Sequence, residues 1–155
     1  MIGGGSSIKN SIDIFNKLDK EKILFIFDCD TKSKREKNIK FLESNNCKYY
    51  ILPVIEVENL ISKKILLEIL KDIKEFHSIK IKDDFDGNEY KSSKFYDFIK
   101  NEILSELPQN MLNSKSLKEL LSDKEVKFAK NYEDLSSEAK KIGEKIYNFI
   151  KLNNY

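Results

Sequence analysis

Two aspartates, Asp28 and Asp30, stand two positions apart directly after the apolar segment 22–27. In extended backbone this spacing points both side chains to the same side. Carboxylates held that close repel each other, and a divalent cation with oxygen ligands relieves the repulsion. Mg²⁺ or Mn²⁺ bound in this way supports hydrolysis or transfer at a phosphodiester. The spacing therefore predicts a metal site on these two aspartates.

A second acidic group, formed by Glu56, Glu58 and Asn59, follows the next apolar segment of the chain. A neighbouring strand that ends there would deliver a further ligand, or a residue that orients one. A second interpretation stays open for both groups. The glutamates would then only begin the following helix, whose N-terminus favours acids, and Asp28 would cap a helix while Asp30 stays in solvent.

The segments around these acids carry the patterns of the elements that would position them. The run over 22–27 is apolar without alternation, which is typical of a parallel strand covered on both faces. A helix over about 34–43 and a strand over 49–52, stopped by Pro53, complete a right-handed βαβ unit. Ligands of open α/β sheets bind at the carboxyl ends of the strands, which is where the two aspartates lie.

The rest of the chain is predicted to be mostly helical. Gly3 to Gly5 suit a tight turn before a helix that Ser6 or Ser7 caps and that runs to about Leu18. Ser62 caps a helix to about Phe76 with a regular apolar stripe. The stripe consists of Ile65, Leu66, Ile69, Leu70 and Ile73. Further helices are expected over about 92–106, 115–121, 123–131 and 136–152. We expect an α/β core over 1–77 and a helical C-terminal extension over 78–155, packed together as one domain.

Length and composition narrow the class of protein. The 155 residues fit one domain, and 28 Lys and Arg against 26 Asp and Glu give a net charge of +2. Nucleic-acid binding would therefore need a local basic patch. Cys29 and Cys47 form no CxxC pair and there is one histidine, which argues against structural zinc and suits a reducing cytoplasm. No apolar run approaches the roughly 20 residues of a membrane span, so we expect a cytoplasmic protein without a membrane partner.

Three motifs occur in an order that resembles a Toprim domain. They are GGGSSI over 3–8, FDCDTK over 27–32, and Pro53 followed by VENL over 57–60. The pattern is most similar to the Toprim domain of overcoming-lysogenisation-defect (OLD) nucleases and related anti-phage effectors. In that family a Gly-rich turn, a DxD motif and an IEN-like segment follow successive strands. The resemblance covers about residues 1–62 and depends on the ordered spacing of the motifs.

This resemblance implies a Rossmann-like, mostly parallel sheet and a divalent-metal endonuclease that acts on DNA or RNA in anti-phage defence. Asp28 and Asp30 match the catalytic metal ligands of the family, Glu58 matches its later acidic position, and Mg²⁺ or Mn²⁺ is the implied cofactor. The family also uses a lysine in its C-terminal part. Lys124 and Lys127 are the candidates, and the alternative for both is a solvated helix face. An ATPase domain or subunit is an implied partner, and an oligomer is compatible with the pattern.

The chain departs from the family at its first element. Toprim domains begin with a strand that ends in a catalytic glutamate, and no such strand precedes the glycines here. We therefore expect a fragment of a longer protein, a half that needs a partner, or a chain without catalysis. In the last case the Toprim-like module would bind a protein partner or nucleic acid instead.

Candidates for binding phosphate or nucleic acid flank the predicted metal site. They are Gly4, Gly5 and Ser6 in the Gly-rich turn, and Lys32, Lys34 and Arg35 after the DxD motif. Lys37 and Lys40 extend this basic cluster, or else form a solvated helix face. Tyr49 and Tyr50 would stack on bases, but adjacent strand residues point to opposite faces, so at least one is expected in the core.

Other enzyme classes fit less well. A haloacid-dehalogenase phosphatase needs Thr or Val four positions after its first Asp, where this chain has Lys32. A P-loop counted from Gly3 has Ile8 where its second glycine is required. A serine or cysteine hydrolase lacks a base, because His77 is the sole histidine.

Overall fold

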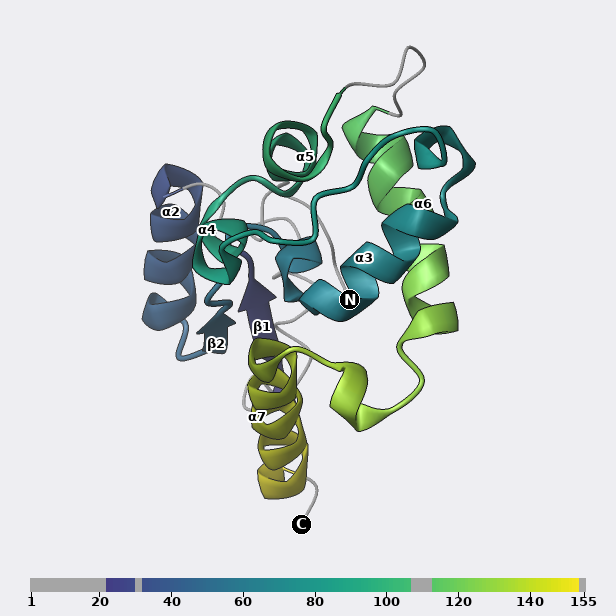
Figure 1. Ribbon diagram of the computed structural model, residues 1–155. Helices are drawn as coiled ribbons and strands as arrows, with labels where there is room; N and C mark the ends of the chain where they lie inside the picture. The colour runs from purple at the N-terminus through teal and green to yellow at the C-terminus, as the bar shows by residue number, and fades with distance from the viewer. Residues whose placement is uncertain (1–21, 30–31, 107–112, 154–155) are drawn as a thin grey trace. The chain divides into compact units, whose positions relative to one another are not determined.

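The computed structural model describes residues 22–29, 32–106 and 113–153, and the side chains of residues 31–35 and 126 lie outside that description (Figure 1). The chain divides into two compact units. The first comprises Met1–Leu52 together with Ile142–Tyr155, and the second is Pro53–Lys141. The helix predicted between Ser7 and Leu18 lies outside the described residues. The division expected at residue 77 stays a prediction.

The first unit contains the predicted strand–helix–strand sequence. Strand β1 (Leu24–Phe27) leads through helix α2 (Lys32–Ser44) to strand β2 (Lys48–Ile51). The two strands are parallel, with Phe27 opposite Ile51, and the N–H of Leu52 extends the ladder by donating to the carbonyl of Phe27 at 2.7 Å. The prediction of a mixed α/β fold with a parallel strand pair is confirmed.

Helix α2 ends at a residue with positive φ. Asn46 adopts φ 54°, in the left-handed region that asparagine tolerates better than most residues. The N–H of Cys47 then donates to the carbonyl of Leu42 at 2.9 Å, which satisfies a carbonyl that the helix leaves open. The chain is thereby turned toward β2, which begins at the next residue.

Strand β1 is less covered than its apolar sequence predicts. Ile26 is 41% exposed, and Leu24, Phe25 and Phe27 are only half-buried. The expectation of a strand covered on both faces is wrong for the part of the chain that the structure describes. The described sheet has two strands, so within the described ranges β1 has one neighbour where a central strand would have two.

Residues 142–153 of helix α7 (Ser137–Asn153) are the remaining described part of the first unit. Ile142 is buried, and two lysine–aromatic contacts join this part of the helix to β2. Nζ of Lys145 lies 3.9 Å from the ring centroid of Tyr50, and Nζ of Lys48 lies 5.4 Å from that of Phe149. These contacts account for the half-burial of Tyr50.

The second unit is built around two helices, α3 (Lys63–Asp72) and α6 (Ser114–Phe128), which pack against each other. The Ser62 hydroxyl caps α3 by accepting from the N–H of Ile65, as predicted. The predicted apolar stripe of α3 is fully buried and joins side chains from α6 and from the segment 76–104 in one core. That core includes Phe76, Phe95, Phe98, Leu117 and Leu121.

Short elements connect these helices. They are η2 (Val57–Leu60), η3 (Lys74–Phe76), α4 (Gly87–Ser92), α5 (Phe95–Phe98), η4 (Ile99–Ile103) and η5 (Tyr132–Asp134). The single helix expected over 92–106 is therefore wrong in its bounds, because α4 already ends at Ser92 and η4 ends at Ile103. Leu104, directly after η4, forms an isolated antiparallel bridge with Ile81, which precedes α4 in the chain. Conversely, the two helices expected over 115–131 are the single helix α6, since neither Ser122 nor Asp123 interrupts it.

No described helix is long and apolar enough to cross a membrane.

Candidate functional site

Asp28 follows the last residue of β1, at the carboxyl end of a strand that runs parallel to its neighbour. Its side chain is exposed, and it takes part in an electrostatic or hydrogen-bonding contact. Cys29 beside it is half-buried. Asp30, the second predicted ligand, lies outside the described residues, as do Gly4, Gly5 and Ser6. The predicted position of Asp28 at a strand end is therefore observed, while the pairing of the two carboxylates stays a prediction.

Helix α2 begins at Lys32, shortly after Asp28. Its first turn carries no acidic residue, which leaves Lys32, Lys34 and Arg35 as the charges of that turn in the sequence. Their side chains lie outside what the structure describes, so their role in phosphate binding stays a prediction. Lys37 and Lys40, farther along α2, are exposed.

Glu58 belongs to the second unit, in a short 3₁₀ helix that follows β2 and Pro53. Its Oε2 lies 3.3 Å from Nζ of Lys118, which also lies 3.0 Å from Oε1 of Glu56. All three side chains are largely buried, with exposed fractions of 26% for Lys118, 19% for Glu56 and 20% for Glu58. Burial lowers the pKa of Lys118, but the two carboxylates outweigh it and hold that pKa above its ordinary value.

The second oxygen of Glu56 is also engaged. Its Oε2 accepts from the N–H of Phe95, at the start of α5, at 2.7 Å. Glu56 thus joins η2 to α5 and, through Lys118, to α6. Both oxygens of Glu56 are thus engaged by the fold.

Asn59 fixes the same turn from inside the core. It is 1% exposed, its Oδ1 accepts from the N–H of Glu56 at 3.0 Å, and its Nδ2 donates to the carbonyl of Tyr90 at 2.6 Å. The Tyr90 hydroxyl donates in turn to the carbonyl of Glu58 at 3.0 Å. Burial, together with the charges of Glu125 and Glu58, holds the pKa of Tyr90 well above its usual value. Tyr90 therefore stays a neutral hydrogen-bond donor.

The candidate lysines Lys124 and Lys127 meet a carboxylate that the sequence did not single out. Both ammonium groups contact Oδ2 of Asp72, at the end of α3, with Lys127 at 3.6 Å. The hydrogen bond from Lys124 holds the pKa of Asp72 below its usual value. Lys124 is 21% exposed, whereas Lys127 is 64% exposed. Lys124 is thus an ion-paired residue of the α3–α6 contact, and Lys127 fits the expected solvated face.

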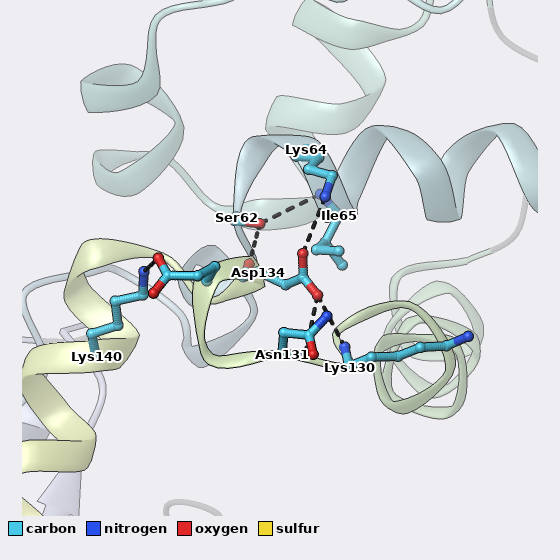
Figure 2. Close-up of polar contacts among 8 residues, drawn as sticks. Ser62, Lys64, Ile65, Lys130, Asn131, Asp134 and Lys140 are labelled. Atoms are coloured by element: carbon cyan, nitrogen blue, oxygen red, sulfur yellow. Dashed lines mark hydrogen bonds and ion pairs between the residues drawn. The ribbon is translucent and has the colours of Figure 1, made fainter.

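A third polar cluster surrounds Asp134 (Figure 2). Its Oδ1 lies 3.1 Å from Nζ of Lys64, and its Oδ2 accepts from the N–H groups of Asn131 and Lys130. The Asp134 carbonyl accepts from the Ser62 hydroxyl at 2.7 Å. Lys64 chiefly holds the pKa of Asp134 below its usual value. The Ser62 and Lys64 contacts join the start of α3 to η5, and the Asn131 and Lys130 contacts close the turn at η5, so the cluster has a structural role.

Sequence reasoning missed Lys118, Asp72 and Asp134 as partners. The apolar periodicity of the sequence predicts the helix that carries Lys118. It does not predict which carboxylate a lysine on the side of that helix will contact. Across the described ranges, no group of three or more His, Cys, Asp or Glu side chains is arranged to hold a metal ion. Comparison with protein-family models, with curated proteins and with solved structures found no match.

Proposed function

We propose that the chain is a Toprim-like nuclease module in which Asp28 and Asp30 hold Mg²⁺ or Mn²⁺. A divalent ion held there would polarise a phosphodiester and lower the pKa of bound water. The observation that carries the proposal is the position of Asp28, an exposed carboxylate directly after β1 in a parallel βαβ unit. Oxygen donors at such strand ends fit a hard cation, so the residues present are compatible with the ion.

The other residues enter the proposal in supporting roles. Lys32, Lys34 and Arg35 would attract the phosphates of DNA or RNA to the start of α2. Glu58 would contribute a further carboxylate, as its match to the family implies. The whole protein would act in anti-phage defence with an ATPase domain or subunit, again on the strength of the resemblance alone.

One observation favours a second candidate, a catalytically inactive module that binds a protein or nucleic acid. The carboxylate of Glu58 already forms an ion pair with Lys118 within the second unit. An acid that is satisfied in this way serves the fold, and it leaves the aspartates without their third predicted ligand.

A cleavage assay separates the two candidates. The full chain is incubated with supercoiled plasmid and with tRNA in Mg²⁺, in Mn²⁺ or in EDTA. We expect metal-dependent cleavage that falls to background in Asp28→Ala and Asp30→Ala. Asp97→Ala, an exposed aspartate of the second unit, is the matched control and should cleave normally. Cleavage that survives both aspartate changes would defeat the nuclease proposal. A wild type that cleaves neither plasmid nor tRNA with either metal ion would favour the binding module.

A further inference from the structure

Helix α7 carries the chain from one compact unit into the other. The boundary falls between Lys141 and Ile142, within a helix that runs without a break over Ser137–Asn153. The chain passes between the units at one further place, between Leu52 and Pro53. Two covalent connections therefore join the units, and one of them is a helix. The stiffness of α7 bears directly on whether the units can change orientation.

The first turn of α7 is held within the second unit. Oε1 of Glu138 lies 2.8 Å from Nζ of Lys91, and both side chains are mostly buried. Nζ of Lys140 lies 3.1 Å from Oε2 of Glu133 and 4.9 Å from the ring centroid of Tyr132. Separating the mostly buried pair would leave each charge without its partner, which is costly. The start of the helix is therefore fixed to the second unit.

The rest of α7 is held by β2 of the first unit. Nζ of Lys145 lies 3.9 Å from the ring centroid of Tyr50, and Nζ of Lys48 lies 5.4 Å from that of Phe149. Both contacts place an ammonium group over an aromatic ring, which is an attractive arrangement. The partners of the helix thus change from one unit to the other within residues 140–145.

Gly143 lies in this interval. It is exposed, and no atom comes within 4 Å of the point where its Cβ would be, so packing does not require a glycine there. Glycine is the poorest helix former after proline, because its backbone loses the most freedom when the helix forms. Alanine at this position would favour the helix by a factor of about five. The glycine therefore makes α7 easier to bend at the place where its partners change.

The other connection between the units is not helical. The N–H of Leu52 donates to the carbonyl of Phe27 in the first unit at 2.7 Å, and the N–H of Ile55 donates to the carbonyl of Lys91 in the second at 3.0 Å. Residues 53–54 lie between these bonds, in neither a helix nor a strand. A short irregular segment can absorb a change of backbone torsion angles, whereas an intact helix resists it. The helix is thus the connection that decides whether the units reorient.

We propose that Gly143 is a hinge in α7, at which the helix bends so that the two units change their orientation relative to each other. Hinges are a few residues, often small ones, that absorb large changes of backbone torsion angles. Gly143 is such a residue, and it lies beside the boundary between the units. The inference goes beyond the proposed function and does not depend on it, since it concerns the chain whether or not nucleic acid is cleaved.

Residual dipolar couplings of backbone N–H groups test the inference on the full chain. The protein is weakly aligned in a stretched uncharged gel, and an alignment tensor is fitted to each unit separately. Parts of one rigid body share a single tensor, so we expect the two tensors of the wild type to differ. In Gly143→Ala the difference should shrink, because the open space accepts a methyl group and the helix becomes stiffer. Lys141→Gly, at an exposed position of the same helix, should enlarge it.

Amide hydrogen exchange measures the opening of the helix itself. In an α-helix the N–H groups of residues 143–147 bond to the carbonyls of residues 139–143, so these bonds span Gly143. They must break when the helix opens at the glycine, and their exchange rates report how often this happens. We expect these rates to fall about fivefold in Gly143→Ala.

Gly87→Ala is the matched control for both measurements. The point where the Cβ of Gly87 would be also has no atom within 4 Å, and the residue lies in α4, inside the second unit. The control should change neither the two tensors nor the exchange of α7. A single tensor shared by both units of the wild type would overturn the inference. So would a tensor difference, or exchange rates at residues 143–147, that Gly143→Ala leaves unchanged.

Discussion

Nζ of Lys118 lies 3.0 Å from Oε1 of Glu56, so an ion pair ties helix α6 to the turn that follows the parallel strand pair in the chain. The same ammonium contacts Glu58 at 3.3 Å. One lysine therefore pairs with two carboxylates that are each about four-fifths buried, which leaves the cluster with one negative charge. Their charges are worth most to the fold when all three are present, because a buried charge without its partner is costly.

Replacement of Lys118 by methionine should therefore destabilise the protein. We expect the free energy of unfolding to fall by about 2 kcal/mol, below the range for fully buried pairs because solvent still reaches this cluster. Urea denaturation followed by circular dichroism measures the loss. Lys115→Met, which removes an exposed pair with Glu119 at 3.7 Å, is the matched control and should cost less than about 0.5 kcal/mol. Equal effects of the two changes would contradict a special role of Lys118.

The buried amide of Asn59 should be nearly as important as this ion pair. Asn59→Ala leaves the N–H of Glu56 and the carbonyl of Tyr90 without their partner, and we expect a loss of about 2 kcal/mol in the free energy of unfolding. Thermal denaturation of Asn59→Ala against Asn101→Ala, at an exposed asparagine, checks this. A melting temperature that drops no more than that of the control would show that the amide does not hold the turn.

Glu125 gives a prediction about pH. Burial raises the pKa of its carboxyl above the unfolded value of about 4.3, so the folded protein binds that proton more tightly than the unfolded chain does. Stability is therefore lost as the pH rises from about 4.3 through the folded-state pKa, and the penalty is constant above it. Glu125→Gln removes the penalty. We expect the variant to exceed the wild type in urea midpoint at pH 7 and to match it at about pH 3.5.

Glu119→Gln is the companion variant for that measurement, since Glu119 is 67% exposed on the same helix. Its urea midpoint should stay close to that of the wild type at both pH values. A Glu125→Gln variant that is less stable than the wild type at pH 7 would mean that the carboxylate makes a favourable contact.

Local signals in the sequence predicted the elements around the sites. The Ser62 cap and the apolar stripe from Ile65 to Ile73 identify α3, because both depend on residues within a few turns of each other. The run before Asp28 and the segment before Pro53 identify the parallel strand pair in the same way. These patterns depend on residues close together in the sequence, and the elements that they predict are present in the structure.

Long-range pairing was not predictable from the same signals. Lys118 meets Glu56, and Lys124 meets Asp72, only because α6 packs where it does in the second unit. A lysine on a helix flank carries no mark of its distant partner, so Lys124 looked equivalent to any solvated lysine. The exposure of Ile26 was missed for a related reason, since an apolar run does not reveal how many strands will lie beside it.

The central claim is that Asp28 and Asp30 together hold a divalent ion, and Mn²⁺ itself is the most direct probe of it. Electron paramagnetic resonance records the signal of free Mn²⁺ as the full chain is added, for the wild type, Asp28→Asn and Asp30→Asn. We predict that the wild type removes the signal with one ion per chain and that each variant leaves it in solution. A wild type that leaves the signal unchanged, or variants that bind Mn²⁺ as it does, would contradict the account.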